Sequence, residues 1–572
     1  MTAPAGEEEP RGVEQRRGSE EPAGIDTDAG AHGAGRAPFA LFAALVVFVW
    51  FAASASRPLF NPDEGRYAEI PREMLAGGDW VIPHLDGLVY IEKPPLQYWA
   101  TAASYRLFGL SAFSARLYTV LTAIGTLLMV FFLVRALWNE RAAWRAAAVL
   151  ASLALFPVIG QMLSLDMSLT FYMTTALAAF LLAQARPSAR WRWMAVAWIA
   201  TALGVLTKGL EAAAIPAATL VLYSLLARDL ALWRRLSFAV GVPLFLAIAL
   251  PWHWLAERRL PDFFEYYVVR QHFLRYLTPT ADREAPWWFF GGVYLAGTLP
   301  WTWTALRVLG AGWRARKPAG AFDAQRFLWV WIAFTIVFFS ISDSKLVPYL
   351  LPVMPALAIL IALRPASSLR RDLLVAAAVT LLAAFALFGA HFALPRMLAG
   401  SPRAVYFLPL TGPVVRIAAV LGLSAVVVLL RRDRDPTGGA VFLGTGWCLG
   451  VLLLIRAATL VAPLYSGRAL AAALPPVDRD VPIYSVATYD QTLPFYWRRT
   501  VDLVSYRGEL NYGLRLDPGR EIPTIAGFVA RWRPSVRACA VMPAGLYERL
   551  RARGVPMREL GHDAHRVLVS RR

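Results

Sequence analysis

Residues 37–56 read APFALFAALVVFVWFAASAS, a run of 20 residues without a charged side chain. An α-helix needs about 20 apolar residues to cross the hydrocarbon core of a bilayer. Residues 1–36, which precede the run, are acidic and rich in Gly, Ala and Pro, and they lack the basic start of a signal peptide. The sequence therefore predicts a disordered tail over 1–36 and a retained first transmembrane helix behind it.

Apolar segments of the same kind recur along the chain up to about residue 460. They lie near residues 113–137, 142–162, 167–185, 191–207, 212–227, 236–256, 287–306, 326–341, 346–363, 372–392, 406–430 and 439–460. Together with the first run they predict thirteen transmembrane helices over residues 37–460. The expected fold class is mainly α, a polytopic α-helical membrane protein.

The composition agrees with a membrane protein and argues against several other classes. Hydrophobic residues make up 57% of the 572 residues and charged residues 17%, whereas soluble domains contain about 25% charged residues. A chain this apolar is not disordered as a whole. Its net charge of +19 arises largely in loops between the predicted helices, so we expect no nucleic-acid partner. Two cysteines, Cys448 and Cys539, support neither a disulfide framework nor a cysteine metal site.

Arginine and lysine are distributed unevenly between the loops. Every second short loop is basic, with about twenty Arg and Lys residues in all, whereas the intervening short loops hold about five. Because basic loops stay in the cytoplasm, the sequence predicts a cytoplasmic N-terminus. An odd number of helices then places the C-terminus on the far side, which is the periplasm if the membrane is a bacterial inner membrane.

Residues 461–572 have a different pattern, in which short β-type runs alternate with helical stretches. The β-type runs are 481–487, 500–505, 538–542 and 566–570, and the helical stretches are 489–498, 523–532 and 544–553. This alternation predicts a separate periplasmic α/β domain over 461–572. Its surplus of arginine suits anionic lipid headgroups, and the alternative is an ordinary solvated surface.

The long far-side loops 57–111 and 257–286, with the neighbouring helix ends, carry polar residues that topology does not explain. These residues are Asp63, Glu64, Arg66, Glu92, Lys93, Asp166, Lys208, Arg270, His272, Lys345 and Tyr349. A carboxylate at a helix end is more often a cap than a catalyst, and a lysine there usually extends toward the interface. Because all of them gather on one membrane face, the sequence predicts an active site or a translocation vestibule.

Lysine is rare in this chain, since only four of the 58 basic residues are lysines and three of the four lie at the far membrane edge. Lysine and arginine there can hold a phosphate whose lipid tail runs down between the helices. Carboxylates beside it can orient a hydroxyl or amine, hold a metal, or stabilise positive charge at an anomeric carbon. Because no Gly-rich nucleotide loop is present, we expect a polyprenyl-phosphate donor and no nucleotide cofactor.

Five stretches closely resemble the bacterial 4-amino-4-deoxy-L-arabinose (aminoarabinose) lipid A transferases. They are DEGRYAEIPREMLAGGDWVIPHLDGLVYIEKPPLQYW at 63–99, SLDMSLTF at 164–171, TKGLEAAAIP at 207–216, RQHFLRYL at 270–277 and SDSKLVPYLLPVMPALAIL at 342–360. That family belongs to the integral-membrane C-type glycosyltransferase superfamily, which includes the protein O-mannosyltransferases. The resemblance is dense over about 57–360, and the predicted topology extends it to nearly the whole chain.

The resemblance implies inverting transfer of aminoarabinose from undecaprenyl phosphate to a lipid A phosphate at the periplasmic face, with resistance to polymyxin as the consequence. It implies that Asp63 is the principal catalytic carboxylate and Asp166 a second acidic participant. It assigns to the carrier phosphate and substrate the residues Arg66, Lys93, Arg270, Lys345, Tyr349, Lys208 and Glu64. Glu92 and His272 become the expected pair for a divalent metal, zinc being favoured.

Two alternatives remain open from the sequence. A related transferase would move another lipid-linked sugar, such as mannose, galacturonic acid or arabinofuranose, to a lipid or protein. A lipid or sugar transporter would also have many helices and a polar vestibule, but it should carry polar features near the midplane that are reached from both sides. The one-sided polar cluster favours the enzyme, and we expect a monomer that contacts donor, lipid A and membrane lipids.

Overall fold

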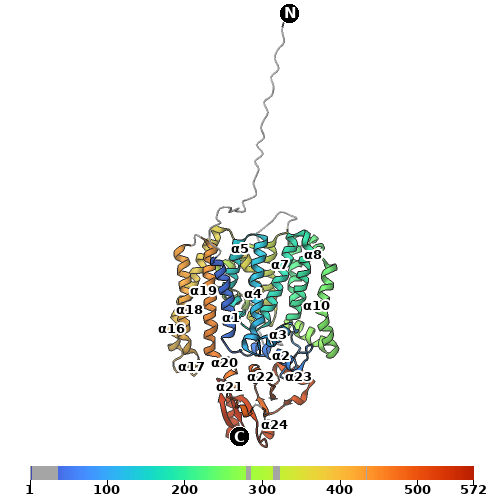
Figure 1. Ribbon diagram of the computed structural model, residues 1–572, viewed down its shortest axis with the longest axis vertical. Helices are drawn as coiled ribbons and strands as arrows, with labels where there is room; N and C mark the ends of the chain where they lie inside the picture. The colour runs from blue at the N-terminus through green and yellow to red at the C-terminus, as the bar shows by residue number, and fades with distance from the viewer. Residues whose placement is uncertain are drawn as a thin grey trace.

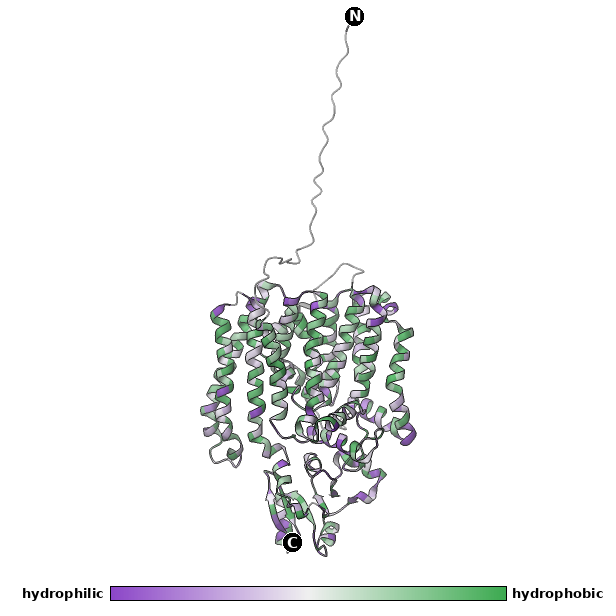
Figure 2. Cartoon of the chain, viewed as in Figure 1, coloured by the Kyte–Doolittle hydropathy of each residue, from purple (hydrophilic) through white to green (hydrophobic). Residues whose placement is uncertain are grey.

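The computed structural model describes residue 2 and residues 37–278, 285–312, 322–432, 435–478 and 480–571. The predicted tail over 1–36 lies outside these residues, apart from Thr2. Long helices run side by side in one bundle, and the C-terminal region with its sheet projects from one end of it (Figure 1). The bundle is coloured as mostly hydrophobic along its length, with hydrophilic residues gathered toward its two ends (Figure 2).

Every one of the thirteen predicted segments contains helix. The helices are α1 Ala37–Ala55, α4 Ala112–Leu137, α5 Glu140–Ser152, α7 Leu165–Ala185, α8 Arg190–Thr207, α9 Glu211–Ala227, α10 Phe238–Arg259, α12 Phe289–Gly297, α13 Thr302–Gly312, α14 Ala324–Ile341, α15 Val353–Ala362, α16 Ala366–Met397, α18 Thr411–Arg431 and α19 Pro436–Ala457. Within the described residues, eight helical segments are long and apolar enough to cross a membrane. The mainly α membrane fold is therefore confirmed, while the count of thirteen crossings stays a prediction.

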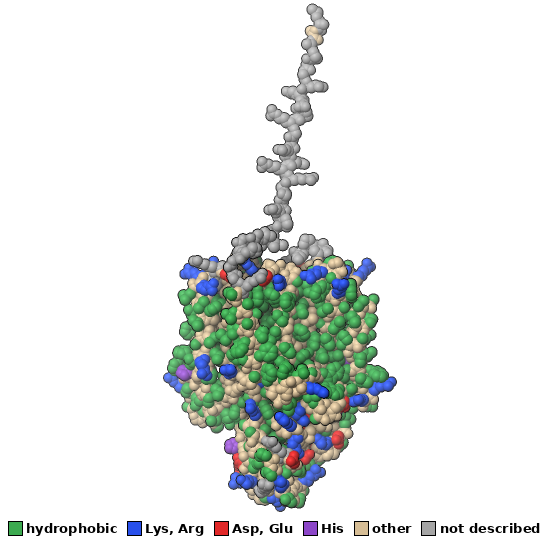
Figure 3. All heavy atoms as spheres, viewed as in Figure 1, with side chains coloured by type: hydrophobic (Ala, Val, Ile, Leu, Met, Phe, Trp, Pro, Cys, Tyr) green, Lys and Arg blue, Asp and Glu red, His purple; other side chains and the backbone are tan. Residues whose placement is uncertain are grey.

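The outer surface of the bundle is apolar, as contact with the hydrocarbon core of a bilayer requires. Seen as spheres, it presents a continuous hydrophobic band whose two borders carry Lys and Arg side chains (Figure 3). Inside the bundle, α5 packs against α4, α15 and α19. Its buried face is made of Ala142, Ala143 and Ala146 among other small residues, and small side chains let transmembrane helices approach closely.

The first long loop folds into two helices and a short hairpin. The helices are α2 Asp63–Gly77 and α3 Leu96–Phe108, and the hairpin pairs β1 His84–Leu85 with β2 Leu88–Val89. The sequence pattern did not predict this hairpin. Its turn is Asp86-Gly87, with φ of 58° and 73°, and Asp-Gly is a common pair in such two-residue turns.

The second long loop contains a π-helix, η3 Phe264–Leu274, followed by the single turn α11 Arg275–Leu277. On the same side of the membrane the short 3-10 helix η4 Val347–Leu350 leads into α15. These elements, with the first loop, lie between the bundle and the C-terminal region and supply most of the candidate residues.

The C-terminal region holds a six-stranded sheet in the order β5-β4-β3-β6-β8-β7. The first four strands in this order are parallel, whereas β8 pairs with β6 and β7 in antiparallel fashion. The strands are β3 Ile483–Val486, β4 Asp502–Val504, β5 Glu521–Ile522, β6 Cys539–Pro543, β7 Arg558–His562 and β8 Arg566–Ser570, and the longer helices are α22 Thr492–Trp497, α23 Asn511–Leu516, α24 Ile525–Trp532 and α25 Ala544–Ala552. The predicted α/β character is confirmed. Strands β5 and β7 were missed because they are short or polar.

The two faces of this sheet are covered by different parts of the chain. One face packs its Val486 and Met542 against Phe528 and Leu546 of α24 and α25. The other face shares a hydrophobic core with Leu85 and other residues of the first loop. The C-terminal region is thus joined to the first loop by a common core, and this contact positions the candidate site.

Candidate functional site

The first turn of α2 presents two neighbouring carboxylates to different surroundings. Asp63 is half exposed, with 47% of its side chain accessible, and one oxygen lies 3.1 Å from Nη1 of Arg66. Asp63 and Arg66 are three residues apart, which is about one helical turn, so their side chains meet on one face of α2. Asp63 therefore faces open space beside a cation, where a substrate can reach it.

Glu64, the next residue, is buried between two arginines. Its carboxylate accepts hydrogen bonds from Nη1 and Nη2 of Arg57 at 2.5 and 2.8 Å and from Nε and Nη2 of Arg116 at 2.8 and 2.9 Å. The backbone amides of Phe60 and Leu163 also donate to it, at 2.8 and 2.9 Å. Burial alone would raise the pKa of Glu64, but Arg116 and Arg57 hold it well below its ordinary value. Glu64 thus joins the first loop to α4 and does not reach the candidate pocket.

A cavity of about 440 Å³ lies where the first loop, α9, η3, α11 and the end of α14 meet. Its polar lining is made of Lys93, Glu211, Gln271, His272, Arg275 and Tyr349 among others. Its apolar lining includes Leu210, Phe338 and Phe339. The cavity therefore combines cations with an apolar wall at the membrane edge.

The ammonium of Lys208, beside this cavity, is paired with two carboxylates. Its Nζ lies 2.8 Å from an oxygen of Asp166 and 3.1 Å from an oxygen of Glu211. The same ammonium stands 4.5 Å from the ring centre of Tyr349. Asp166, Lys208 and Tyr349 are therefore brought together as predicted, and the two carboxylates leave this group with one net negative charge.

Lys93 differs from Lys208 because its ammonium has no carboxylate at ion-pair distance. Within the part of the chain that the structure describes, no carboxylate oxygen lies within 4.0 Å of it. Burial, together with the positive charge of Arg275, lowers the pKa of Lys93 to about 8. An anion bound in the cavity would relieve both effects.

Arg275 lines the cavity and lies in the same far-side loop as Arg270, to which the sequence assigned the carrier phosphate. Its Nη1 lies 2.9 Å from Oε1 of Gln271 and 3.7 Å from Oε2 of Glu92. The signal was present in the spacing, since Arg275 follows His272 by three residues and residues so spaced share a helix face. Arg270 lies two residues before His272, which places it on another face.

Of the seven residues predicted to hold the carrier phosphate and substrate, Lys93 and Tyr349 line the cavity, whereas Glu64, Arg66, Lys208, Arg270 and Lys345 do not. Arg270 is half exposed and points to Glu265, 3.7 Å away. Nζ of Lys345 donates to the carbonyl oxygen of Ser342 at 2.6 Å and is nearly buried. Lys345 therefore stabilises its own loop, while Ser342 and Ser344 of that loop line the cavity.

The expected metal pair does not have the surroundings of a metal site. Nδ1 of His272 lies 2.7 Å from the carbonyl oxygen of Tyr267, and Nε2 accepts a hydrogen bond from the Leu210 amide at 3.2 Å. Glu92 faces Arg275. Among the described residues no group of three or more His, Cys, Asp and Glu side chains could hold a metal ion. A metal at Glu92 and His272 stays a prediction, and no step below depends on it.

The C-terminal region reaches the site through Glu509, which the sequence reasoning missed. Glu509 forms a close ion pair with Arg66 and accepts a hydrogen bond from Nε2 of Gln491 at 2.7 Å. Burial raises the pKa of Glu509, although Arg66 opposes the rise. Gly65 permits this contact, because a Cβ there would lie 2.5 Å from the backbone carbon of Gln491.

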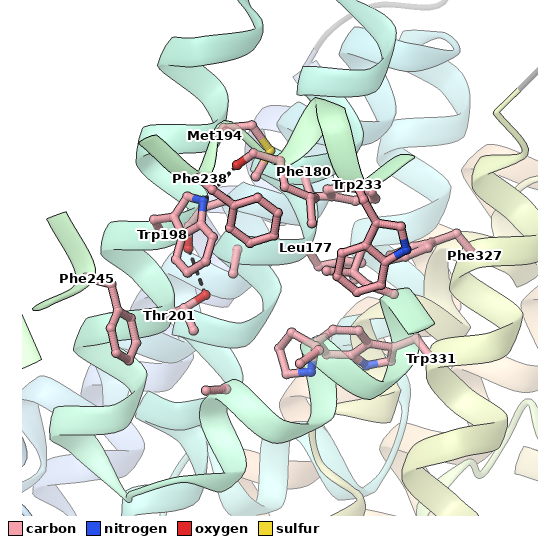
Figure 4. A pocket seen from close by; sticks show the side chains of 17 residues that line it. Leu177, Phe180, Met194, Trp198, Thr201, Trp233, Phe238, Phe245, Phe327 and Trp331 are labelled. Atoms are coloured by element: carbon pink, nitrogen blue, oxygen red, sulfur yellow. Dashed lines mark hydrogen bonds between the residues drawn. The ribbon is translucent and has the colours of Figure 1, made fainter. Parts of the chain in front are cut away.

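A second cavity, of about 220 Å³, is apolar and lies among α7, α8, α9, α10 and α14, next to the 3-10 helix η2 Leu230–Leu236 (Figure 4). The rings of Trp198, Trp233 and Trp331 line it, with Phe180 and other residues. Nε1 of Trp198 donates to the carbonyl oxygen of Leu236 at 2.9 Å. The one polar atom of the Trp198 side chain is therefore hydrogen-bonded within the cavity wall. Helices α9 and α14 line both this cavity and the polar one.

Family models match two parts of the chain. The model described as dolichyl-phosphate-mannose-protein mannosyltransferase matches residues 39–267. The model described as aminoarabinose transferase C-terminal domain matches residues 469–571, the part that contains the sheet.

Curated relatives agree with these models. An undecaprenyl phosphate-alpha-4-amino-4-deoxy-L-arabinose arabinosyl transferase of Sodalis glossinidius is 36% identical over 331 residues, which cover 56% of this chain and 58% of that protein. The enzyme of the same name from Aeromonas salmonicida is 36% identical over 310 residues, or 54% and 56% of the two chains. The matched stretches thus span somewhat more than half the length of these relatives.

A bundle of membrane helices with a one-sided polar pocket and a C-terminal α/β region defines a protein of the integral-membrane C-type glycosyltransferase superfamily. The crystal structure of ArnT from Cupriavidus metallidurans bound to undecaprenyl phosphate superposes with a TM-score of 0.84 at 32% identity, covering 94% of this chain and 99% of that one. The apo structure of the same protein gives 0.85, with coverage of 93% and 97%. The chain belongs to the aminoarabinose transferase family.

Proposed function

We propose that this protein transfers 4-amino-4-deoxy-L-arabinose from undecaprenyl phosphate to a phosphate of lipid A. The relatives named above are arabinosyl transferases that use an undecaprenyl phosphate donor. The Cupriavidus metallidurans protein binds undecaprenyl phosphate. The acceptor, lipid A, is proposed from the resemblance of the first-loop motif to the aminoarabinose lipid A transferases.

The observation that carries the proposal is the unpaired ammonium of Lys93 at the cavity, with Arg275 close enough to lower its pKa. A phosphate bound there would gain charge-assisted hydrogen bonds from two cations. It would also give the Lys93 ammonium a close anionic partner, which no carboxylate of the described residues supplies within 4.0 Å. The nearby Lys208 is already neutralised by Asp166 and Glu211, so it shapes the site more than it binds the anion.

The apolar cavity supports a lipid carrier. A polyprenyl chain whose phosphate lies near Lys93 can enter the bundle between α9 and α14, because both cavities border these helices. Burial of hydrocarbon against Trp198, Trp233 and Trp331 would contribute binding free energy of about 25 cal/mol for each Å² removed from water. A water-soluble nucleotide sugar would not use such a wall.

The proposal gives Asp63, which is half exposed beside Arg66, the role of stabilising charge on the sugar. In the proposed reaction the bond between the anomeric carbon and the carrier phosphate breaks, and a lipid A phosphate oxygen bonds to that carbon from the opposite side. Undecaprenyl phosphate leaves with the bonding electrons. The lipid A phosphate is already anionic at neutral pH, so Asp63 has little need to remove a proton. Its carboxylate instead faces oxocarbenium-like charge or the sugar ammonium.

The proposal places the protein in a bacterial inner membrane, with the N-terminus in the cytoplasm and the C-terminal region in the periplasm. The basic short loops support this orientation. So does the gathering of the candidate residues at the end of the bundle that bears the C-terminal region. Capping lipid A phosphate with a cationic sugar would lower the negative surface charge that attracts polymyxin.

Mass spectrometry of lipid A tests the proposal. Cells that carry the gene should contain lipid A with the added mass of one aminopentose, and deletion should remove it. Restoring the wild-type gene should restore the mass, whereas the Asp63→Asn gene should not. An unchanged spectrum, or a different sugar increment, would shift the assignment to another lipid-linked sugar, which the match to a mannosyltransferase model over 39–267 makes the second candidate.

A further inference from the structure

A pocket outside the candidate active site lies where the C-terminal region meets the membrane helices. It has a volume of about 350 Å³. On the side of the membrane helices it is lined by Ala55 at the end of α1 and by Ala112 and Phe113 at the start of α4. Its other lining residues are Arg57, Leu110, Ser111, Arg468, Phe495, Tyr496 and Arg498. A neighbouring hollow of about 330 Å³ shares Tyr496 and Arg498 and adds Trp497 and Arg499.

This pocket carries positive charge that its surroundings do not balance. Arg57 and Arg116 share the single carboxylate of Glu64, so that cluster keeps one net positive charge. Arg468 and Arg498 are exposed, and neither forms an ion pair with a carboxylate of the described residues. An anion bound between them would face three net positive charges.

The position of the pocket fits a lipid better than a soluble anion. Both α1 and α4 qualify as membrane-crossing helices, and their ends form its floor. Leu107 and Phe108, at the end of α3 just before Leu110, are 75% and 60% exposed. Apolar side chains this exposed beside a membrane helix are solvated by hydrocarbon rather than by water. The arginines and Tyr496 on the side of the C-terminal region suit a phosphate headgroup, and the hydrocarbon-facing residues on the side of the bundle suit its acyl chains.

The pocket is separate from the candidate active site. It shares no lining residue with the cavity at Lys93 and His272. Its buried edge, Arg57, is bound to Glu64, which faces away from the exposed Asp63. A ligand here would therefore contact the α1–α4 edge and the C-terminal region without displacing the donor.

We propose that this pocket binds the phosphate headgroup of an anionic glycerophospholipid. The lipid links the C-terminal region to the membrane surface, since Arg468 and Arg498 belong to that region and the pocket floor belongs to the bundle. The arginine surplus of residues 461–572 thereby has a specific place of action at Arg468 and Arg498.

Titration of the purified full-length protein with phosphatidylglycerol, read by native mass spectrometry, tests this proposal. The wild type should retain phosphatidylglycerol about tenfold more tightly than phosphatidylcholine, because only the former has a net negative headgroup. The double substitution Arg468→Gln/Arg498→Gln should weaken phosphatidylglycerol binding about tenfold, since two charge-assisted contacts are lost. Each single substitution should give a part of this loss.

The matched control is Arg531→Gln/Arg533→Gln, which removes the same charge from the last turn of α24 and the residue that follows the helix, at the far end of the C-terminal region (Figure 1). It should leave phosphatidylglycerol affinity unchanged, and the lipid-free melting temperature of both double variants should equal that of the wild type. The proposal is overturned by unchanged affinity in the Arg468/Arg498 variant, by an equal loss in the control, or by equal binding of phosphatidylcholine. Tighter binding of lipid A that is lost in the same variant would assign the pocket to the acceptor and would overturn the glycerophospholipid as its occupant.

Discussion

Asp63 and Glu64 are neighbours in the sequence and carry the same functional group, yet the structure uses them in opposite ways. Asp63 is half exposed and has one cationic contact, at 3.1 Å to Arg66. Glu64 is 2% exposed and accepts hydrogen bonds from two arginines and two backbone amides. The helical turn of α2 separates them because consecutive residues point about 100° apart.

The difference shows how a carboxylate at a membrane edge becomes available for chemistry. A fully bonded carboxylate has no lone pair to offer a substrate, and its removal leaves buried cations unpaired. A carboxylate with one partner keeps acceptor capacity and remains reachable. The same contrast separates Lys93, which has no carboxylate within 4.0 Å among the described residues, from Lys208, which has two.

The largest effect is expected for Glu64→Ala, which removes the buried member of the carboxylate pair. Arg57 and Arg116 would then share the protein interior without an anion, at a cost of about 3–5 kcal/mol in free energy of unfolding. The melting temperature of the purified protein should fall sharply, or the protein should fail to accumulate. Normal stability together with lost transfer would contradict the comparison, because Glu64 would then act in the reaction.

The second prediction concerns Asp63→Asn, which keeps the shape of the exposed member and removes its charge. Transfer should fall about 100-fold, the size typical of losing one group that stabilises transition-state charge. The melting temperature should stay within a few degrees of the wild type, because an exposed side chain contributes little to stability. Near-normal transfer, measured as aminopentose added to lipid A, would remove Asp63 from the reaction.

The third prediction extends the comparison to two lysines that the sequence does not distinguish. Lys93→Ala should weaken binding of undecaprenyl phosphate about tenfold or more, because a charge-assisted contact to phosphate is lost. Lys345→Ala should change this affinity by less than about threefold, since its ammonium already donates to the Ser342 carbonyl. A binding assay with purified protein compares the two. Equal losses would show that Lys345 reaches the phosphate after all.

The sequence predicted those properties that depend on local pattern. Apolar runs of about twenty residues predicted membrane helices, and the alternation of β-type and helical runs predicted the C-terminal α/β character. Both predictions were confirmed. The one-turn spacing placed Arg66 beside Asp63 correctly. The short hairpin at Asp86-Gly87 was missed because two-residue strands carry too little pattern.

Site residues were harder to predict because their roles depend on distant partners. The sequence cannot show that Arg116, on α4, takes Glu64 out of the site, or that Lys345 turns toward its own loop. Arg270 and Arg275 lie in one motif, and the structure shows that Arg275 is the one that reaches the cavity. Glu509 could not be predicted, since its contact with Arg66 joins the first loop to the C-terminal region.

The smallest effect is expected for Glu509→Gln, which tests whether the C-terminal region positions the exposed side of α2. Losing the ion pair frees Arg66 to move, and Arg66 is the cation beside Asp63. Transfer should fall about threefold to tenfold through misplacement of these groups, with kcat affected more than the KM for donor. Glu521→Gln, which breaks the pair with exposed Arg507 in the same region, is the matched control and should leave transfer unchanged. If Glu509→Gln and Glu521→Gln change transfer to the same extent, Glu509 supports only the fold of its own region. The difference between Asp63 and Glu64 would then be set within the first loop alone.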